Sequence, residues 1–265
     1  VSKIETSAAI DQLHEVIAAS DVVMVARGDL GIDCPLVDVP HLQKRIVRRC
    51  LEYGTPVISA TQMLESMIHA PSPTRAEVTD VANAVFDGTD GLMLSGETAI
   101  GRDPAGVVAR MASIAERAEA EGSYRRWAER LGRVQREHWD STSDRITAAL
   151  CHAASDAAVD VEATAILCCT VSGRTAEAMA RFRPMAQLIA LSPQMETVRR
   201  LTLSWGVDPI QVEMYRSTDD MVWYAVERAA ELGRVRSGDN VVVLAGSPRR
   251  DTSTAADVLR IVTVR

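Results

Sequence analysis

Short apolar runs rich in β-branched residues recur along the first half of the chain, and a stretch of helical periodicity follows each one. The apolar runs span residues 21–26, 56–59 and 91–94. The helical stretches span residues 41–53, 75–86 and 103–121, and residues 3–5 end a further strand before a helix at 8–19. This alternation predicts four βα units with parallel strands.

A short polar segment, called a tag below, follows each of these apolar runs. The tags centre on Asp29, Thr61 and Ser95, which are 32 and 34 residues apart in the chain. In a closed (β/α)8 barrel the carboxyl ends of the strands line the active site, so we expect the tags to share one rim. The chain begins within a strand and four units are half of such a barrel. We therefore expect a fragment whose other half lies upstream, or a half-barrel that pairs with a second copy.

The second half of the chain carries another βα series. Its strands are predicted at residues 163–170, 187–191, 209–213, 240–245 and 259–264. Its helices are predicted at residues 144–159, 176–182, 195–205 and 221–232. We expect a smaller open α/β sandwich domain at 144–265, with its last two strands antiparallel, and a helical linker at 123–143 that joins it to the barrel segment at 1–122.

The composition is that of a folded, acidic protein. Hydrophobic residues make up 47% and charged residues 25% of the 265 positions, which excludes a mainly disordered chain. The formal net charge of −7 argues against binding to nucleic acid. No apolar run approaches the roughly 18–20 residues that span a bilayer. The five cysteines show no C-x-x-C spacing, so we expect a cytoplasmic protein.

Lys3 stands out because lysine is rare in this chain. The sequence has two lysines, Lys3 and Lys44, among 29 basic residues. If Lys3 shares a rim with Glu5, Asp29 and Thr61, one cation, two carboxylates and one hydroxyl gather around one cavity. Paired carboxylates suit Mg²⁺, and a flexible lysine suits a phosphate or a developing enolate oxygen. The alternative is that these are solvated or ion-paired rim residues without a ligand.

Gly28 adds a backbone feature to the same rim. Because glycine has no side chain, a ligand can approach the chain closely there. A substrate carboxylate could accept amide hydrogens at Gly28 if a helical turn starts immediately afterwards, and the Thr61 hydroxyl could donate to the same group.

A loop in the second half has the composition of a phosphate site. It lies between a predicted strand and a predicted helix and reads Thr170-Val171-Ser172-Gly173-Arg174-Thr175. Backbone amides, hydroxyl groups and Arg174 could surround a phosphate, and Arg249 and Arg250 in the loop at 246–254 could add charge. The alternatives are that Ser172 or Thr175 is a bare N-cap and that the later loop is a solvated hairpin.

Five motifs of the first half occur in one order and are similar to those of pyruvate kinases. They are Val25-Ala26-Arg27-Gly28-Asp29-Leu30-Gly31, Ala60-Thr61-Gln62-Met63-Leu64-Glu65-Ser66-Met67, Pro73-Thr74-Arg75-Ala76-Glu77, Asp80-Val81-Ala82-Asn83-Ala84-Val85 and Met93-Leu94-Ser95-Gly96-Glu97-Thr98-Ala99. The chain thus resembles the second half of the pyruvate kinase barrel followed by the C-terminal α/β domain of that family.

The resemblance implies a role for each rim residue. Lys3 would stabilise the enolate and the transferring phosphoryl group, and Thr61 would assist in catalysis. Glu5 and Asp29 would bind the essential Mg²⁺, with Mn²⁺ as a substitute. Lys3, Gly28, Asp29 and Thr61 would contact phosphoenolpyruvate. The implied reaction transfers the phosphoryl group to ADP and gives pyruvate and ATP, the last step of glycolysis.

The resemblance also implies regulation and assembly. The loop with Thr170, Ser172, Gly173, Arg174 and Thr175 would hold the phosphate of an allosteric sugar phosphate or nucleotide. Arg75 would lie at a contact between catalytic domains of a homotetramer, although it could instead merely cap a helix start. The K⁺ site, several nucleotide contacts and a mobile lid domain of the family come from sequence upstream of Lys3, so we expect the 265-residue segment alone to be nearly inert.

Two other functions are weighed against this one. The first is a non-catalytic module, derived from a pyruvate kinase, that senses phosphorylated metabolites through the loop at 170–175. The second is another Mg²⁺-dependent barrel enzyme that uses phosphoenolpyruvate, which the ordered motifs disfavour. The sequence upstream of the segment separates the catalytic function from the sensing function.

Overall fold

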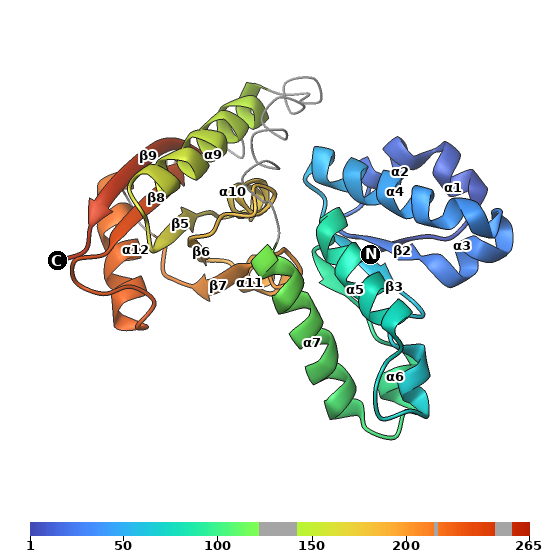
Figure 1. The fold of residues 1–265 in the computed structure, drawn as a ribbon. Helices are drawn as coiled ribbons and strands as arrows, with labels where there is room; N and C mark the ends of the chain where they lie inside the picture. Colours follow the sequence, from blue (N-terminus) through green and yellow to red (C-terminus); the bar gives the residue numbers. More distant parts are fainter. Residues whose placement is uncertain (122–141, 215–216, 247–255) are drawn as a thin grey trace. The chain divides into compact units, whose positions relative to one another are not determined.

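The computed structural model describes residues 1–121, 142–214, 217–246 and 256–265 (Figure 1). The chain divides into two compact units, residues 1–122 and 123–265. The linker predicted at 123–143 and the arginine-bearing loop predicted at 246–254 fall almost wholly outside the described residues.

The first unit is built on a parallel sheet, as the alternation of strands and helices predicts. Its strands within the described residues are β1 (Ser2–Ile4), β2 (Val23–Ala26), β3 (Val57–Ala60) and β4 (Gly91–Leu92). They lie in the order β1-β2-β3-β4, and every neighbouring pair is parallel. The last residue of β2, Ala26, is level with the last residue of β3, Ala60. The segments that follow these two strands therefore start from one edge of the sheet.

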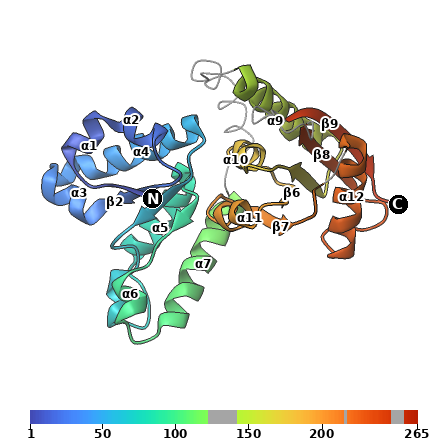
Figure 2. The ribbon, with the colours of Figure 1, turned by 180° about the vertical axis from the view of Figure 1, so that it is seen from behind.

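Helices connect the strands and cover the sheet of the first unit (Figures 1 and 2). They are α1 (Ser7–Asp11), α2 (Leu13–Ala18), α3 (Arg27–Asp33), α4 (Val39–Tyr53), α5 (Arg75–Asp87), α6 (Gly96–Ala99) and α7 (Pro104–Glu121), with 3₁₀ turns η1 (Leu36–Asp38) and η2 (Glu65–Ile68). The single helix predicted at 8–19 is in fact two, because Gln12 leaves the helical conformation between them.

Helix α5 begins with a capping box. The Thr74 hydroxyl accepts the Glu77 backbone N–H at 3.2 Å, and the Glu77 carboxylate accepts the Thr74 N–H at 2.7 Å. Glu77 also accepts two hydrogen bonds from Ser66. Burial raises the pKa of Glu77, but the hydrogen bonds from Ser66 and Thr74 lower it by more. The pKa of Glu77 is therefore below its ordinary value. The N-cap is therefore Thr74, and the interpretation of Arg75 as the cap of this helix is wrong.

The second unit is an open α/β sandwich, as predicted. Its described strands are β5 (Ala165–Cys169), β6 (Gln187–Ser192), β7 (Val207–Gln211), β8 (Asn240–Gly246) and β9 (Ala256–Thr263), in the order β7-β6-β5-β8-β9. β9 is antiparallel to β8, which confirms the predicted pairing of the last two strands, and the other pairs are parallel. Its helices are α9 (Thr142–Asp160), α10 (Arg174–Ala180), α11 (Met195–Leu201) and α12 (Thr218–Glu231).

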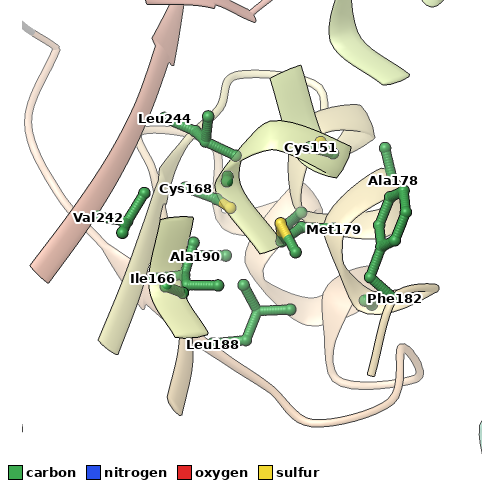
Figure 3. Close-up of a cluster of buried hydrophobic side chains, with 14 of the residues drawn as sticks. Cys151, Ile166, Cys168, Ala178, Met179, Phe182, Leu188, Ala190, Val242 and Leu244 are labelled. Atoms are coloured by element: carbon green, nitrogen blue, oxygen red, sulfur yellow. The ribbon is translucent and has the colours of Figure 1, made fainter. Parts of the chain in front are cut away.

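The central strand β5 is buried on both faces, which is typical of a parallel strand between helical layers. Ile166 and Cys168 point to the face that packs with α9 and α10, where Cys151 and Met179 join them (Figure 3). Alternate residues such as Leu167 point to the opposite face, which α12 covers. The two layers of helices thus hold the carboxyl end of β5 in a fixed place.

All five cysteines lie in the described residues and are free thiols. Cys168 and Cys169 are buried in β5, and burial raises the pKa of the Cys169 thiol to about 12. Such thiols are small core residues, as the sequence indicates. Within the described part of the chain, no helix is both long and apolar enough to cross a bilayer.

Candidate active site

Three charged side chains meet at the carboxyl edge of the first sheet. Lys3 lies in β1, Glu5 follows the end of β1, and Asp29 lies in the first turn of α3, directly after β2. Lys3 Nζ is 2.6 Å from Glu5 Oε2 and 2.7 Å from Asp29 Oδ2. Each of the three side chains is about half exposed. The structure therefore brings together three of the four rim residues selected from the sequence, and leaves them open to solvent.

The cluster favours the charged forms of Lys3 and Asp29. The hydrogen bond that Lys3 donates to Asp29, and then the one that it donates to Glu5, raise the pKa of the Lys3 ammonium above its ordinary value. The same contact with Lys3 lowers the pKa of Asp29. At neutral pH the rim therefore presents one fixed positive charge flanked by two carboxylates.

Glu5 and Asp29 are suited to share a magnesium ion. Their carboxylates already converge on one cation, since both contact the ammonium of Lys3. Among the described residues, no group of three or more His, Cys, Asp or Glu side chains is placed to hold a metal. Two carboxylates agree with Mg²⁺, which is usually held by one or two protein carboxylates while water and substrate oxygens fill its other positions.

Thr61 and Gly28 meet beside this cluster. Thr61 follows β3, and its Oγ1 accepts the Gly28 backbone N–H at 2.9 Å. The same hydroxyl donates to the Ala60 carbonyl at 2.7 Å. A Cβ added at Gly28 would lie in ordinary contact with Thr61, 3.5 Å from Oγ1, so packing against Thr61 does not demand glycine. The missing side chain instead leaves the amide edge of α3 accessible.

Two residues of the strand-end motifs have structural roles that the sequence did not reveal. The Arg27 guanidinium reaches from the end of β2 to the carbonyl groups at the end of β3. The Glu97 side chain, 3% exposed, accepts the backbone N–H groups of Leu64 and Ser95. Both belong to the tags, and partners more than 30 residues away in the chain leave no local signal that could have singled them out.

The predicted phosphate loop follows β5 in the second unit. Thr170 and Thr175 are buried, whereas Ser172 and Arg174 are exposed. The Thr170 hydroxyl accepts the Gly173 N–H at 2.9 Å. Gly173 is the N-cap of α10, so the alternative in which Ser172 or Thr175 caps this helix is wrong. Ser172 and Arg174 therefore supply the outward-facing polar groups of the loop.

Two residues of helix α11 donate hydrogen bonds to this loop. Thr197 Oγ1 donates to the Val171 carbonyl at 2.9 Å, and Arg200 donates to the Ser172 carbonyl while its Nε lies 3.2 Å from Glu177 Oε1. Gly173 has φ of +88°, and a Cβ there would lie 2.8 Å from Arg200 Nη2. The backbone conformation therefore favours glycine, and a larger residue would also displace the Arg200 guanidinium.

Comparisons with known proteins agree with both units. The family model described as "Pyruvate kinase, barrel domain" matches residues 1–108, and the one described as "Pyruvate kinase, alpha/beta domain" matches residues 148–262. The pyruvate kinase of Clostridium acetobutylicum is 46% identical over 254 residues, which are 96% of this chain and 52% of that protein. A pyruvate kinase of Staphylococcus aureus is 42% identical over 253 residues, 95% of this chain and 42% of that protein.

A solved structure supports the same relationship. The crystal structure of a pyruvate kinase from Cryptosporidium parvum aligns with a TM-score of 0.88 and 33% sequence identity, over 100% of this chain and 51% of that one. The fold and the rim define a segment of a parallel β/α barrel joined to an open α/β domain. The chain belongs to the pyruvate kinase family, and it spans about half the length of the relatives that it matches.

The ion cluster predicts a pH effect on the metal-free protein. In Lys3→Met the pKa of Asp29 should rise toward its ordinary value of 3.8, because the contact with Lys3 is the main cause that lowers it. Since the folded-state pKa of Asp29 is lowered, its stabilising contribution is complete above the unfolded-state pKa and is lost as pH falls through the folded-state value. Carboxyl ¹³C NMR titration measures the shift.

Lys44→Met provides the matched control for that titration. Lys44 pairs with Asp87 on another part of the same unit, so its loss should leave Asp29 unaffected. An unchanged Asp29 pKa in Lys3→Met would show that the contact with Lys3 does not govern the carboxylate.

Proposed function

We propose that the full-length protein transfers the phosphoryl group of phosphoenolpyruvate to ADP, giving pyruvate and ATP, the last step of glycolysis. The observation that carries this proposal is the convergence of Lys3, Glu5 and Asp29 at the carboxyl edge of a parallel sheet, beside the contact between Gly28 and Thr61. In β/α barrels this edge is where substrates bind. Membership of the pyruvate kinase family supports the assignment of the substrates.

Phosphoryl transfer needs positive charge where negative charge develops. We assign that role to Lys3, whose ammonium stays protonated because the contacts with Asp29 and Glu5 raise its pKa. When bound between Glu5 and Asp29, Mg²⁺ would neutralise charge on substrate oxygens. With Glu5 and Asp29 holding the metal, the Lys3 ammonium would be available to the enolate oxygen and the phosphoryl group.

Gly28, Asp29 and Thr61 are proposed to hold phosphoenolpyruvate. The Gly28 N–H now donates to Thr61 Oγ1 at 2.9 Å, and the Thr61 hydroxyl donates to the Ala60 carbonyl at 2.7 Å. A substrate carboxylate could replace this contact and accept from both donors, which fixes the substrate next to Lys3. Such positioning is a large part of catalysis in phosphoryl transfer, because little covalent chemistry is asked of the protein.

Other parts of the reaction are assigned to sequence outside these 265 residues. The relatives are about twice as long as this chain, which covers 52% of the Clostridium acetobutylicum protein. We propose that this further sequence supplies the K⁺ ligands, several nucleotide contacts and the closure of the barrel. The segment alone should therefore have little activity, and catalytic tests belong to the full-length protein.

Lys3→Met is the most direct test of this mechanism. In the full-length protein it should lower turnover by about 100- to 1000-fold or more, because it removes a charge that is needed at the transition state. Phosphoenolpyruvate binding, measured by calorimetry with Mg²⁺ present, should stay within a factor of about three. Lys44→Met, which removes the other lysine, should behave like the unmodified protein. Near-normal turnover of Lys3→Met would refute the role of Lys3.

We further propose that the loop at 170–175 binds the phosphate of an allosteric sugar phosphate or nucleotide. Ser172 and Arg174 face solvent at the carboxyl edge of a parallel sheet, and the hydrogen bonds from Thr197 and Arg200 fix the loop behind them. Thr170 and Gly173 shape the loop, and the side chain of Thr175 is buried. Ligand contact is therefore assigned to Ser172 and Arg174 and to the backbone of the loop.

Ser172→Glu tests this loop without disturbing the core. The added carboxylate should repel a phosphate, so activation by a sugar monophosphate, a sugar bisphosphate or AMP should fall at least about tenfold while the basal rate is kept. Thr263→Glu is the charge control, because Thr263 pairs with Asn240 at the opposite end of the sheet. Full activation of Ser172→Glu by the same effectors would exclude the loop as their site.

The proposed function also implies an oligomeric assembly and a cellular location. Arg75 is exposed at the start of α5, where Thr74 already provides the cap, so the helix start does not need its guanidinium. We assign Arg75 to a contact between catalytic domains of a homotetramer. A reducing cytoplasm suits the five free thiols.

A further inference from the structure

The chain leaves the usual backbone regions at the carboxyl end of β3. Thr61 has φ of +68° and Gln62 has φ of +54°, both in the left-handed region that favours glycine. Such residues are strained, and a β-branched residue such as Thr61 is especially disfavoured. Neighbouring groups must therefore hold this turn in place.

Arg27 makes the contacts that hold the turn. Its Nε donates to the Ala60 carbonyl at 3.2 Å, and its Nη2 donates to the Thr61 carbonyl at 2.6 Å and to the Gln62 carbonyl at 3.4 Å. Nη2 also contacts the sulfur of Met63. One guanidinium thus bonds three successive carbonyl groups of the strained segment, and charge-assisted hydrogen bonds of this kind are among the stronger ones.

Asp80 fixes the other side of the guanidinium. Arg27 Nη1 lies 2.8 Å from Asp80 Oδ1 and 2.6 Å from Asp80 Oδ2, and the Arg27 side chain is 10% exposed. Gln43 of α4 adds a longer contact at 3.4 Å and also donates to Asp87 at 3.2 Å. Helices α4 and α5 therefore anchor the cation that spans from β2 to β3.

The conformation of this turn sets the position of the Thr61 hydroxyl at the proposed substrate site. With its backbone left-handed, Thr61 Oγ1 accepts the Gly28 N–H at 2.9 Å and donates to the Ala60 carbonyl. If the turn relaxed, this hydroxyl would move away from the Gly28 amide. The contacts of Arg27 and the contact between Thr61 and Gly28 are therefore parts of one arrangement.

We propose that Arg27, anchored by Asp80, is a positioning residue: it holds the left-handed turn at Thr61 and Gln62 and thereby directs the Thr61 hydroxyl to the Gly28 amide. The inference rests on the proposed function, in which these two donors receive the substrate carboxylate. Lysine cannot replace arginine here, because a single ammonium cannot reach Asp80 and the three carbonyl groups in the same fixed geometry.

Arg27→Lys in the full-length protein is the first test. It should raise KM for phosphoenolpyruvate at least about tenfold and leave KM for ADP within about twofold, since the misplaced donors are assigned to one substrate. Arg49→Lys is the control, because Arg49 pairs with Glu52 within α4. Asp80→Asn keeps the side-chain size and weakens the contact with Arg27. It should also raise KM for phosphoenolpyruvate more than KM for ADP.

A second test separates positioning from general loss of structure. Glycine tolerates positive φ, so Gln62→Gly added to Arg27→Lys should restore a large part of the affinity for phosphoenolpyruvate. In the ligand-free protein, the Gly28 amide should exchange its hydrogen at least about fivefold faster in Arg27→Lys, whereas amides of β5 should not change.

The outcomes distinguish this inference from the proposed function. If the unmodified protein does not turn over phosphoenolpyruvate, the proposed function fails, and hydrogen exchange at Gly28 still decides the role of Arg27. If the unmodified protein is active, equal changes in both KM values or unchanged exchange at Gly28 in Arg27→Lys would overturn the inference. Unequal KM values together with rescue by Gln62→Gly would establish it.

Discussion

The parallel register of β1, β2 and β3 is the constraint on which the candidate site depends. Because Ile4 is level with Val25 and Ala26 is level with Ala60, chain segments more than 20 residues apart leave the sheet at one edge. The side chains that follow these strands must then share a small volume. The ion cluster around Lys3 and the contact between Thr61 and Gly28 are direct results of this alignment.

Both units contain a left-handed residue after a strand, and they accommodate it in different ways. Each needs a left-handed residue just after a strand whose end carries polar groups. In the second unit Gly173 takes φ of +88° without steric cost, and Arg200 packs where its side chain would be. In the first unit Thr61 takes φ of +68°, and the hydrogen bonds of Arg27 offset the strain. The second solution keeps a hydroxyl at the site, which glycine could not provide.

Much of this fold was predictable from the sequence because strand and helix patterns are local. β3 was expected at 56–59 and lies at Val57–Ala60, and the polar tags indicated that Lys3, Asp29 and Thr61 would share an edge. The break at Gln12 and the left-handed turn at Thr61 were not predictable, because neither residue type favours that conformation locally. The role of Arg27 depends on Asp80, 53 residues away, and a distant partner of this kind leaves no local signal.

We propose above that the carboxylates around Lys3 bind the metal of a phosphoryl-transfer site. The most direct measurement is a crystal structure of the full-length protein grown with Mn²⁺ and oxalate, with diffraction data collected at the manganese absorption edge. The account predicts an anomalous peak at coordination distance from both Glu5 and Asp29, with the Lys3 ammonium moved from the carboxylates toward oxalate. A manganese peak away from both carboxylates, with Lys3 still between them, would contradict it.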